Sequence, residues 1–136
     1  MNKKNELLCP CGSTKMYSEC CGKYHQGTNP ENALALMKSR YSAYSLNLAD
    51  YIMHTTHPKN PRFKADKTTW KKQILEFSQN TVYEKLDILD FTDGSIEAFV
   101  TFVAHLKHKN KDATFTERSR FEKINGQWLY LDGVIS

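Results

Sequence analysis

All four cysteines of this 136-residue chain lie within thirteen residues, at Cys9, Cys11, Cys20 and Cys21. Proline, glycine and serine follow the first cysteines, and such turn-forming residues let two thiols one residue apart converge on a single ion. Four thiolates suit tetrahedral zinc, whose binding energy can fold a peptide too short to bury a core. The spacing therefore predicts a structural zinc site, closed by four protein ligands and without chemistry of its own.

Two other uses of clustered thiols fit less well. The Cys-x-x-Cys spacing of thioredoxin-type redox motifs is absent, so disulfide exchange is the second choice. Iron–sulfur ligation, the third, usually has longer spacings and a proline after the last cysteine. The chain also has no apolar leader and no run of membrane-spanning length, so we expect a cytoplasmic protein without membrane insertion. In that reducing compartment metal ligands are favoured over structural disulfides.

The stretch CPCGSTKMYSECCG resembles the SEC-C motif, a zinc-binding element of the SecA preprotein translocase and of many unrelated bacterial proteins. The match places Cys9, Cys11 and Cys20 on its three invariant cysteines. Cys21 falls on the fourth ligand position, which is cysteine or histidine, and His25 is an alternative ligand. The resemblance covers residues up to about position 22 and implies docking to a partner rather than catalysis.

The resemblance leads us to expect a docking surface for a protein or ribonucleoprotein partner, formed by Lys15, Tyr17 and Lys23. An exposed aromatic side chain beside cations suits an interface. The alternative is that Tyr17 packs over the zinc loop. Residues 59–72 hold six basic side chains against one acidic, either as a solvated loop or as a surface for an anionic partner. Few aromatic residues are interleaved there, so direct nucleic-acid binding is not expected.

Beyond residue 27 the pattern becomes helical. Residues 28–48 combine a capping residue at Thr28 or Asn29, a first-turn proline and an apolar stripe that includes Met37 and Tyr41. Residues 49–58 predict a second helix that stops at a proline, and residues 68–79 a third, capped by Thr68.

After residue 80 the apolar period becomes two, which predicts strands. Asp93-Gly94 and Asn125-Gly126 indicate type I′ hairpin turns, since both central residues of such a turn need positive φ. The first turn joins strands 82–92 and 95–106, and the second joins strands 114–124 and 127–135. Three helices and a four-strand antiparallel meander predict an α+β fold, with the helices on one face of the sheet.

That order resembles the cone-shaped nuclear transport factor two-like (NTF2-like) superfamily. The stretches LMKSRYSAY, THP and ERSRFEKINGQWLYLDG are similar to the YchJ family of uncharacterised bacterial proteins, which place a SEC-C motif ahead of such a domain. The resemblance spans essentially the whole chain. It implies a zinc-binding element at residues 1–27 and a cone domain at residues 28–136, in which three helices pack on a curved four-strand sheet.

Strand alternation in residues 114–124 turns Glu117 and Ser119 inward beside two phenylalanines. A carboxylate there needs a partner, and Arg40 on the first helix is the expected one, as a structural ion pair or as part of a ligand site. The full candidate cavity comprises Arg40, Tyr41, His57, Glu117, Ser119 and Trp128. His57 has a second interpretation, as a cap at the end of its helix.

Two functions fit these residues. The first is an adaptor or binding protein with a zinc knob for docking and a cone that holds a small ligand or nothing. The second is a small enzyme of isomerase, dehydratase or hydrolase type that acts on a metabolite in the cone. The sequence favours the first, because the cysteine motif is its most specific feature and fold alone does not decide function.

Overall fold

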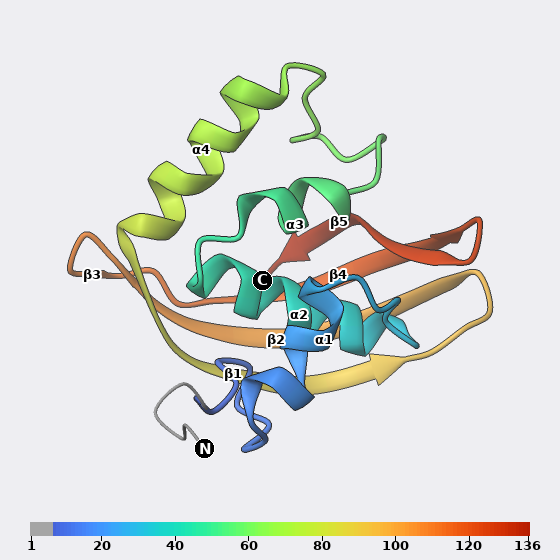
Figure 1. The fold of residues 1–136 in the computed structure, drawn as a ribbon, viewed down its shortest axis with the longest axis horizontal. Helices are drawn as coiled ribbons and strands as arrows, with labels where there is room; N and C mark the ends of the chain where they lie inside the picture. The colour runs from blue at the N-terminus through green and yellow to red at the C-terminus, as the bar shows by residue number, and fades with distance from the viewer. Residues whose placement is uncertain (1–6) are drawn as a thin grey trace.

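The computed structural model describes residues 7–136. In chain order the elements are the 3-10 helix Tyr17–Glu19, the helices α1 (Cys21–His25), α2 (Ala33–Ser45), α3 (Ala49–His54) and α4 (Lys67–Gln79), and the strands β1 (Thr81–Thr92), β2 (Glu97–His108), β3 (Lys111–Asp112), β4 (Phe115–Ile124) and β5 (Gln127–Ile135). In Figure 1 the helices α1, α2 and α3 lie over the middle of the sheet, and α4 lies to one side. Within the described residues, no helix is long and apolar enough to cross a lipid bilayer.

The sheet is an antiparallel meander with the strand order β1-β2-β4-β5, as the alternation predicts. The two-residue strand β3 pairs with the end of β2, within the tip that joins the two hairpins. Its presence makes five strands rather than the expected four. The register places Phe102 opposite Glu117 and Phe121 opposite Tyr130, so these four side chains share the face that the helices cover.

One of the two predicted hairpin turns is correct. Asn125 and Gly126 have φ values of 51° and 79°, as a type I′ turn requires. Asp93-Gly94 does join β1 and β2 in a hairpin, but the predicted type I′ turn is wrong there, because neither residue has positive φ and the loop spans residues 93–96. Gly94 is needed there for close approach instead, since a Cβ at this position would collide with the Glu97 carbonyl oxygen.

The three expected helices are present, but α2 and α4 begin at other caps. Asn32, not Thr28 or Asn29, caps α2 by accepting a 2.8 Å hydrogen bond from the Ala35 amide. Asp66, not Thr68, caps α4 by accepting from the amides of Thr68 and Thr69. Asn and Asp are among the strongest N-caps, and each of these directly precedes the first helical residue, whereas Thr28 and Asn29 lie further upstream and Thr68 lies inside α4.

Helix α3 ends at His54, earlier than the proline at position 58 predicts. The hydroxyl of Thr55 donates to the Tyr51 carbonyl oxygen, and that of Thr56 to the Ile52 carbonyl oxygen. The chain then joins the outer edge of β5, where Thr56 forms a parallel bridge with Tyr130. This edge pairing removes the residues after His54 from the helix.

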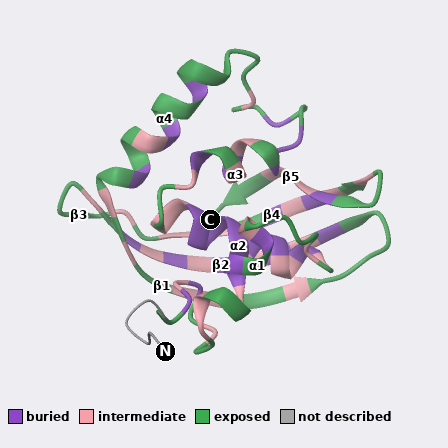
Figure 2. Ribbon diagram, in the orientation of Figure 1, coloured by how far each residue is buried: buried purple, intermediate pink, exposed green. Residues whose placement is uncertain are grey.

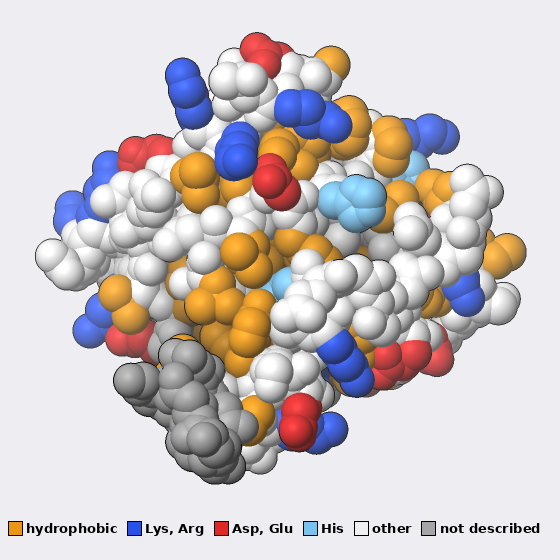
Figure 3. Space-filling view, viewed as in Figure 1, with side chains coloured by type: hydrophobic (Ala, Val, Ile, Leu, Met, Phe, Trp, Pro, Cys, Tyr) orange, Lys and Arg blue, Asp and Glu red, His pale blue; other side chains and the backbone are white. Residues whose placement is uncertain are grey.

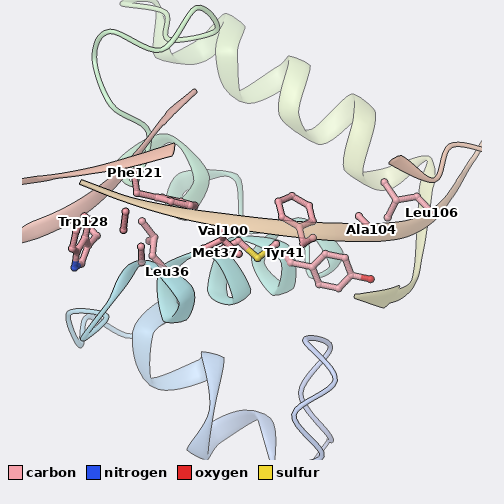
Figure 4. Packing of buried hydrophobic residues seen from close by; sticks show 11 residues of the cluster. Leu36, Met37, Tyr41, Val100, Ala104, Leu106, Phe121 and Trp128 are labelled. Carbon is pink, nitrogen blue, oxygen red and sulfur yellow. The ribbon is translucent and has the colours of Figure 1, made fainter. Parts of the chain in front are cut away.

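The main core lies between α2 and the sheet. Figure 4 shows Leu36, Met37 and Tyr41 pointing from α2 toward Val100 and Phe121 on the strands. Helix α2 is also buried on sides other than the one that packs on the sheet, as Figure 2 shows. Two of its serines, Ser39 and Ser42, are 0% exposed. The sheet therefore covers one side of α2, while the cysteine loop and α3 cover others.

Candidate metal centre and adjoining groove

The four cysteine sulfur atoms lie within 4.8 Å of one another. The Sγ atoms of Cys11 and Cys20 are 3.6 Å apart, and a tetrahedral zinc–thiolate site has a sulfur–sulfur edge of about 3.8 Å. An antiparallel bridge between Leu8 and Met16 closes the loop that holds the first pair. The second pair lies at the start of α1. These residues could hold a metal ion, and their donor set fits one.

The electrostatics of the cluster favour a bound cation. Hydrogen bonding from the Cys11 thiol lowers the pKa of Cys9, whereas hydrogen bonding with Cys11 and burial raise the pKa of Cys21. Four crowded thiols cannot all ionise, because each new thiolate is repelled by its neighbours. A divalent cation removes this conflict, since metal coordination deprotonates thiols outright.

The cysteine loop is fastened to α2 and α3 rather than set apart from them. Ser42 Oγ lies 3.5 Å from Cys9 Sγ, and His25 Nε2 lies 2.8 Å from the Ser39 carbonyl oxygen. A carbonyl only accepts, so Nε2 carries the ring proton and Nδ1 accepts from the Tyr17 hydroxyl. Burial lowers the pKa of His25, which agrees with a neutral ring. Both ring nitrogens are engaged in this way, so His25 is not a metal ligand.

The three predicted docking residues differ in their surroundings. Lys15 and Lys23 are exposed. Tyr17 is half-buried, packs against the cysteine cluster and covers Gly22, where an added Cβ would meet its ring. Tyr17 thus packs over the cysteine loop, as the alternative interpretation describes. A docking surface that includes Lys15 and Lys23 stays a prediction.

A groove of about 360 Å³ lies at the junction of the cysteine element and the main domain. Its walls include Tyr24 and His25 from α1, Tyr51 and His54 from α3, and Trp128 from β5. A second hollow of about 220 Å³ shares His25, Asp50 and Tyr51 with the first, so the two adjoin along α3. The larger hollow lies within the size range of small-ligand sites.

Figure 3 shows the face of the molecule that carries these helices. Hydrophobic side chains gather at its centre, histidines lie beside them, and lysine and arginine side chains lie over α4 and the loop before it. At the groove itself, the carboxylate of Asp50 pairs with the Lys71 ammonium at 3.3 Å, and Glu31 accepts from the Tyr24 hydroxyl at 2.6 Å. Both acidic groups beside the groove are therefore already engaged.

Of the predicted cavity residues, Glu117 and Ser119 do come together. Both face the helices, and the Glu117 carboxylate accepts hydrogen bonds from the hydroxyls of Ser119 and Tyr130, the latter at 2.7 Å. Gly133 on β5 leaves the space that this carboxylate occupies. In residues 7–136 no ion pair joins Glu117 to Arg40. Arg40 lies instead with its guanidinium 4.7 Å from the centre of the Tyr130 ring, and Tyr130 separates it from the carboxylate.

Arg40 has other partners at the end of α3. Its Nη1 donates to the Ile52 carbonyl oxygen at 3.1 Å and to the Thr55 hydroxyl at 2.8 Å. Since Arg40 is only 8% exposed, these bonds and the aromatic ring compensate for burying its charge. Arg40 therefore fixes α2 against α3 and β5.

The remaining cavity residues lie in separate surroundings. His57 accepts at Nδ1 from the Lys59 amide and donates from Nε2 to Glu122 at 2.7 Å, beside the outer edge of β5. Tyr41 is buried in the core against Tyr83. Trp128 lines the groove at the cysteine element. The six residues therefore do not share one cavity.

Several residues that build the site carried no clear signal in the sequence. Ser42 stands in a helix where serine is usually exposed, and only the spacing of small residues at positions 39 and 42 indicates a close neighbour. Tyr130, Tyr51 and Tyr24 resemble ordinary core aromatics. Their common location depends on the packing of α1, α3 and β5, which sequence periodicity does not specify.

Known proteins that are similar to this chain combine an NTF2-like domain with a cysteine-containing SEC-C motif. Residues 32–133 match the family model described as YchJ, middle NTF2-like domain. A UPF0225 protein of Enterobacter sp. (strain 638) is 37% identical over 130 residues, which cover 93% of this chain and 82% of that protein.

Two solved structures extend the likeness to nearly the whole chain. The solution structure of a SEC-C motif containing protein from Rhodopseudomonas palustris has a TM-score of 0.80 and 28% identity, covering 96% of this chain and 99% of that one. The crystal structure of a SEC-C motif containing protein from Psychrobacter arcticus has a TM-score of 0.74 and 26% identity, covering 95% and 82%. The chain described here therefore belongs to the YchJ family, and it joins that family's NTF2-like domain to a SEC-C cysteine cluster.

Proposed function

We propose that this protein is a zinc-dependent binding protein, which docks a protein or ribonucleoprotein partner at the junction of its two parts. The observation that carries the proposal is the groove whose walls come from both parts, Tyr24 and His25 on one side and Tyr51, His54 and Trp128 on the other. In this role zinc is structural, because its four thiolate ligands leave no open position for substrate. Its effect on binding is to hold α1 in place as a wall.

The proposal moves the predicted ligand site from the inside of the cone to its rim. Side chains of the main core fill the space between α2 and the sheet, as Leu36 and Phe121 illustrate in Figure 4. The rim groove instead combines apolar and aromatic walls with a few polar groups, the composition common in binding sites. Lys15 and Lys23 on the cysteine element would then lie beside a partner rather than form the whole contact.

The experiment has two parts. Elemental analysis of protein purified without chelator should find one zinc per chain. Amide chemical shifts of the labelled, zinc-loaded protein should then be recorded with pools of metabolites and short peptides. We expect responses to peptides at Tyr51, His54 and Trp128 that disappear when zinc is removed, whereas responses to metabolites alone would contradict the docking of a macromolecular partner. Ligand responses that persist unchanged without zinc would contradict the role given to α1.

One observation favours a second candidate, a small enzyme. Glu117 is a carboxylate on the helix-covered face with two hydroxyl donors, and burial raises the pKa of one of them, Tyr130. Glu117→Gln separates the two roles, with Glu84→Gln on β1 as the control. If the cluster is structural, Glu117→Gln lowers stability by about 1–2 kcal/mol, as for a disturbed buried hydrogen bond, and leaves groove binding unchanged. Intact stability with a lost ligand response would favour the enzyme.

A further inference from the structure

The outer edge of β5 is covered along only part of its length. The Tyr130 amide donates to the Thr55 carbonyl oxygen at 2.9 Å, and the Tyr130 carbonyl oxygen accepts from the His57 amide at 2.9 Å. The chain reaches this edge only at Thr55, because α3 ends at His54. The covering segment therefore stops before it reaches Trp128, two residues earlier on β5.

The backbone of Trp128 faces the part of the edge that this segment leaves unpaired, and the residue as a whole is 4% exposed. Residues two apart on a strand direct their amide and carbonyl groups to the same side, and β5 has no irregularity between Trp128 and Tyr130. Trp128 thus presents its N–H and C=O away from β4, as Tyr130 does. Among the described residues neither group has a backbone partner outside the sheet, and Trp128 lines the groove. Such an edge can pair with an added extended chain.

Two lysine side chains at the groove have no ion-pair partner within residues 7–136. The hydrogen bond from the Tyr24 hydroxyl lowers the pKa of Glu31, and one of these lysines, Lys23, lies close enough to that carboxylate to help lower it. The Lys23 ammonium lies 5.2 Å from the centre of the Tyr24 ring, and the Lys123 ammonium lies 5.8 Å from the centre of the Trp128 ring. Both rings belong to residues that line the groove. Within residues 7–136 neither lysine has an ion-pair partner, while the acidic Asp50 is already paired with Lys71. The ammonium groups of Lys23 and Lys123 beside the groove can therefore pair with carboxylates of a partner.

We propose that the groove receives an extended peptide segment with acidic side chains, which adds to the edge of β5 at Trp128. Its main chain bonds to the Trp128 N–H and C=O, and its carboxylates meet the ammonium groups of Lys23 and Lys123. The inference rests on the proposed function as a binding protein and specifies the class of its partner. Backbone pairing supplies affinity, and the lysines select the charge of the partner.

The test uses the zinc-loaded full chain and two capped hexapeptides, one alternating glutamate with valine and one alternating lysine with valine. The acidic peptide should shift the Trp128 amide and slow its hydrogen exchange, and it should bind at least tenfold more tightly than the basic one. Backbone N-methylation of the acidic peptide should abolish this effect, because a methylated nitrogen cannot donate. Equal binding of both peptides, or binding that survives N-methylation, would overturn the proposal.

Variants locate the charge contacts. The double variant Lys23→Glu and Lys123→Glu should weaken binding of the acidic peptide at least tenfold. The control Lys109→Glu makes the same type of charge change at the exposed turn between β2 and β3 and should leave binding unchanged. An equal loss of binding in the double variant and in Lys109→Glu would show that Lys23 and Lys123 do not contact the peptide, and would overturn the charge contacts assigned to them. If groove residues respond to other peptides in a zinc-dependent way but not to the acidic peptide, the present inference fails while the proposed function stands.

Discussion

Arg120 and Asp132 form a bidentate pair on the sheet face away from the helices. Arg120 Nε lies 3.0 Å from Asp132 Oδ1, and Nη2 lies 2.7 Å from Oδ2. Hydrogen bonding from Arg120 lowers the pKa of Asp132. A carboxyl whose pKa is lowered by folding stabilises the fold above its ordinary pKa of about 3.9, and this contribution is lost as the pH falls toward the lowered value.

We therefore expect Asp132 to titrate below the ordinary range in the native protein. Arg120→Met should raise its pKa back toward that range, because the two donors are removed. Carboxyl chemical shifts measured against pH will report both values. Arg62→Met, in the exposed loop before α4, is the control and should leave Asp132 unaffected. An identical titration of Asp132 in the native protein and in Arg120→Met would contradict this account.

Single residues also show how far the sequence predicts the site. The cysteine spacing predicted that the four thiols gather, because they are local in sequence and chemically distinctive, and they do gather. Strand alternation correctly turned Glu117 and Ser119 inward. The partner of Glu117 was missed, because Tyr130 comes from a neighbouring strand and Arg40 contacts Tyr130 rather than the carboxylate. Alternation assigns a face but does not choose among the side chains on it.

At the level of elements, the contact between the cysteine loop and α2 depends on small side chains. Ser42 is fully buried, and its hydroxyl lies 3.5 Å from Cys9 Sγ. A hydrogen bond to a coordinating thiolate orients it and disperses its charge, and loss of such an outer partner costs about tenfold or more in metal affinity. Ser42→Ala should therefore release zinc more readily.

The measurement is zinc transfer to a chromophoric chelator under reducing conditions, with an expected loss of about tenfold in affinity for Ser42→Ala. Ser45→Ala is the matched control on the same helix, since its hydroxyl bonds to the Ser42 carbonyl oxygen and to no cysteine. Equal affinities for Ser42→Ala and Ser45→Ala would show that the hydroxyl does not support the metal site.

The elements themselves were predicted better than their ends. Apolar periods of helix and strand type located α2, α3, α4 and the four long strands. The ends depend on competition between adjacent polar residues, and here Asn32 and Asp66 cap helices that Thr28 and Thr68 were expected to begin. The short α3 ends where edge pairing with β5 replaces helical bonding, a tertiary effect without a local signal.

For the whole molecule, residues on the two sides of the predicted boundary near residue 27 share buried surface. His25 reaches the Ser39 carbonyl oxygen and packs edge-on against Tyr51, at 4.7 Å between ring centres. We expect chelation of zinc to lower the melting temperature by about 5–10 °C, on the order of 2 kcal/mol for a domain of this size. The main transition should remain single, because the sheet and its helices keep their core.

Calorimetry with and without a zinc chelator measures this shift, and readdition of zinc should reverse it. An unchanged melting temperature would mean that the cysteine element folds independently of the main domain. Complete loss of the transition would mean that the main domain cannot fold without the element. Either result would contradict the shared-surface account.

The position of the ligands has a consequence for synthesis on the ribosome. Cys9 to Cys21 are translated before α2, α3, α4 and every strand of the sheet. Their contacts span few residues, so in the proposed zinc-bound form the loop can close on the ion while the rest of the chain is still being made. When α2 emerges, it meets a finished surface on which Ser39 and Ser42 can dock. A metal bound as proposed would thus give the growing chain an early template for its most deeply buried helix.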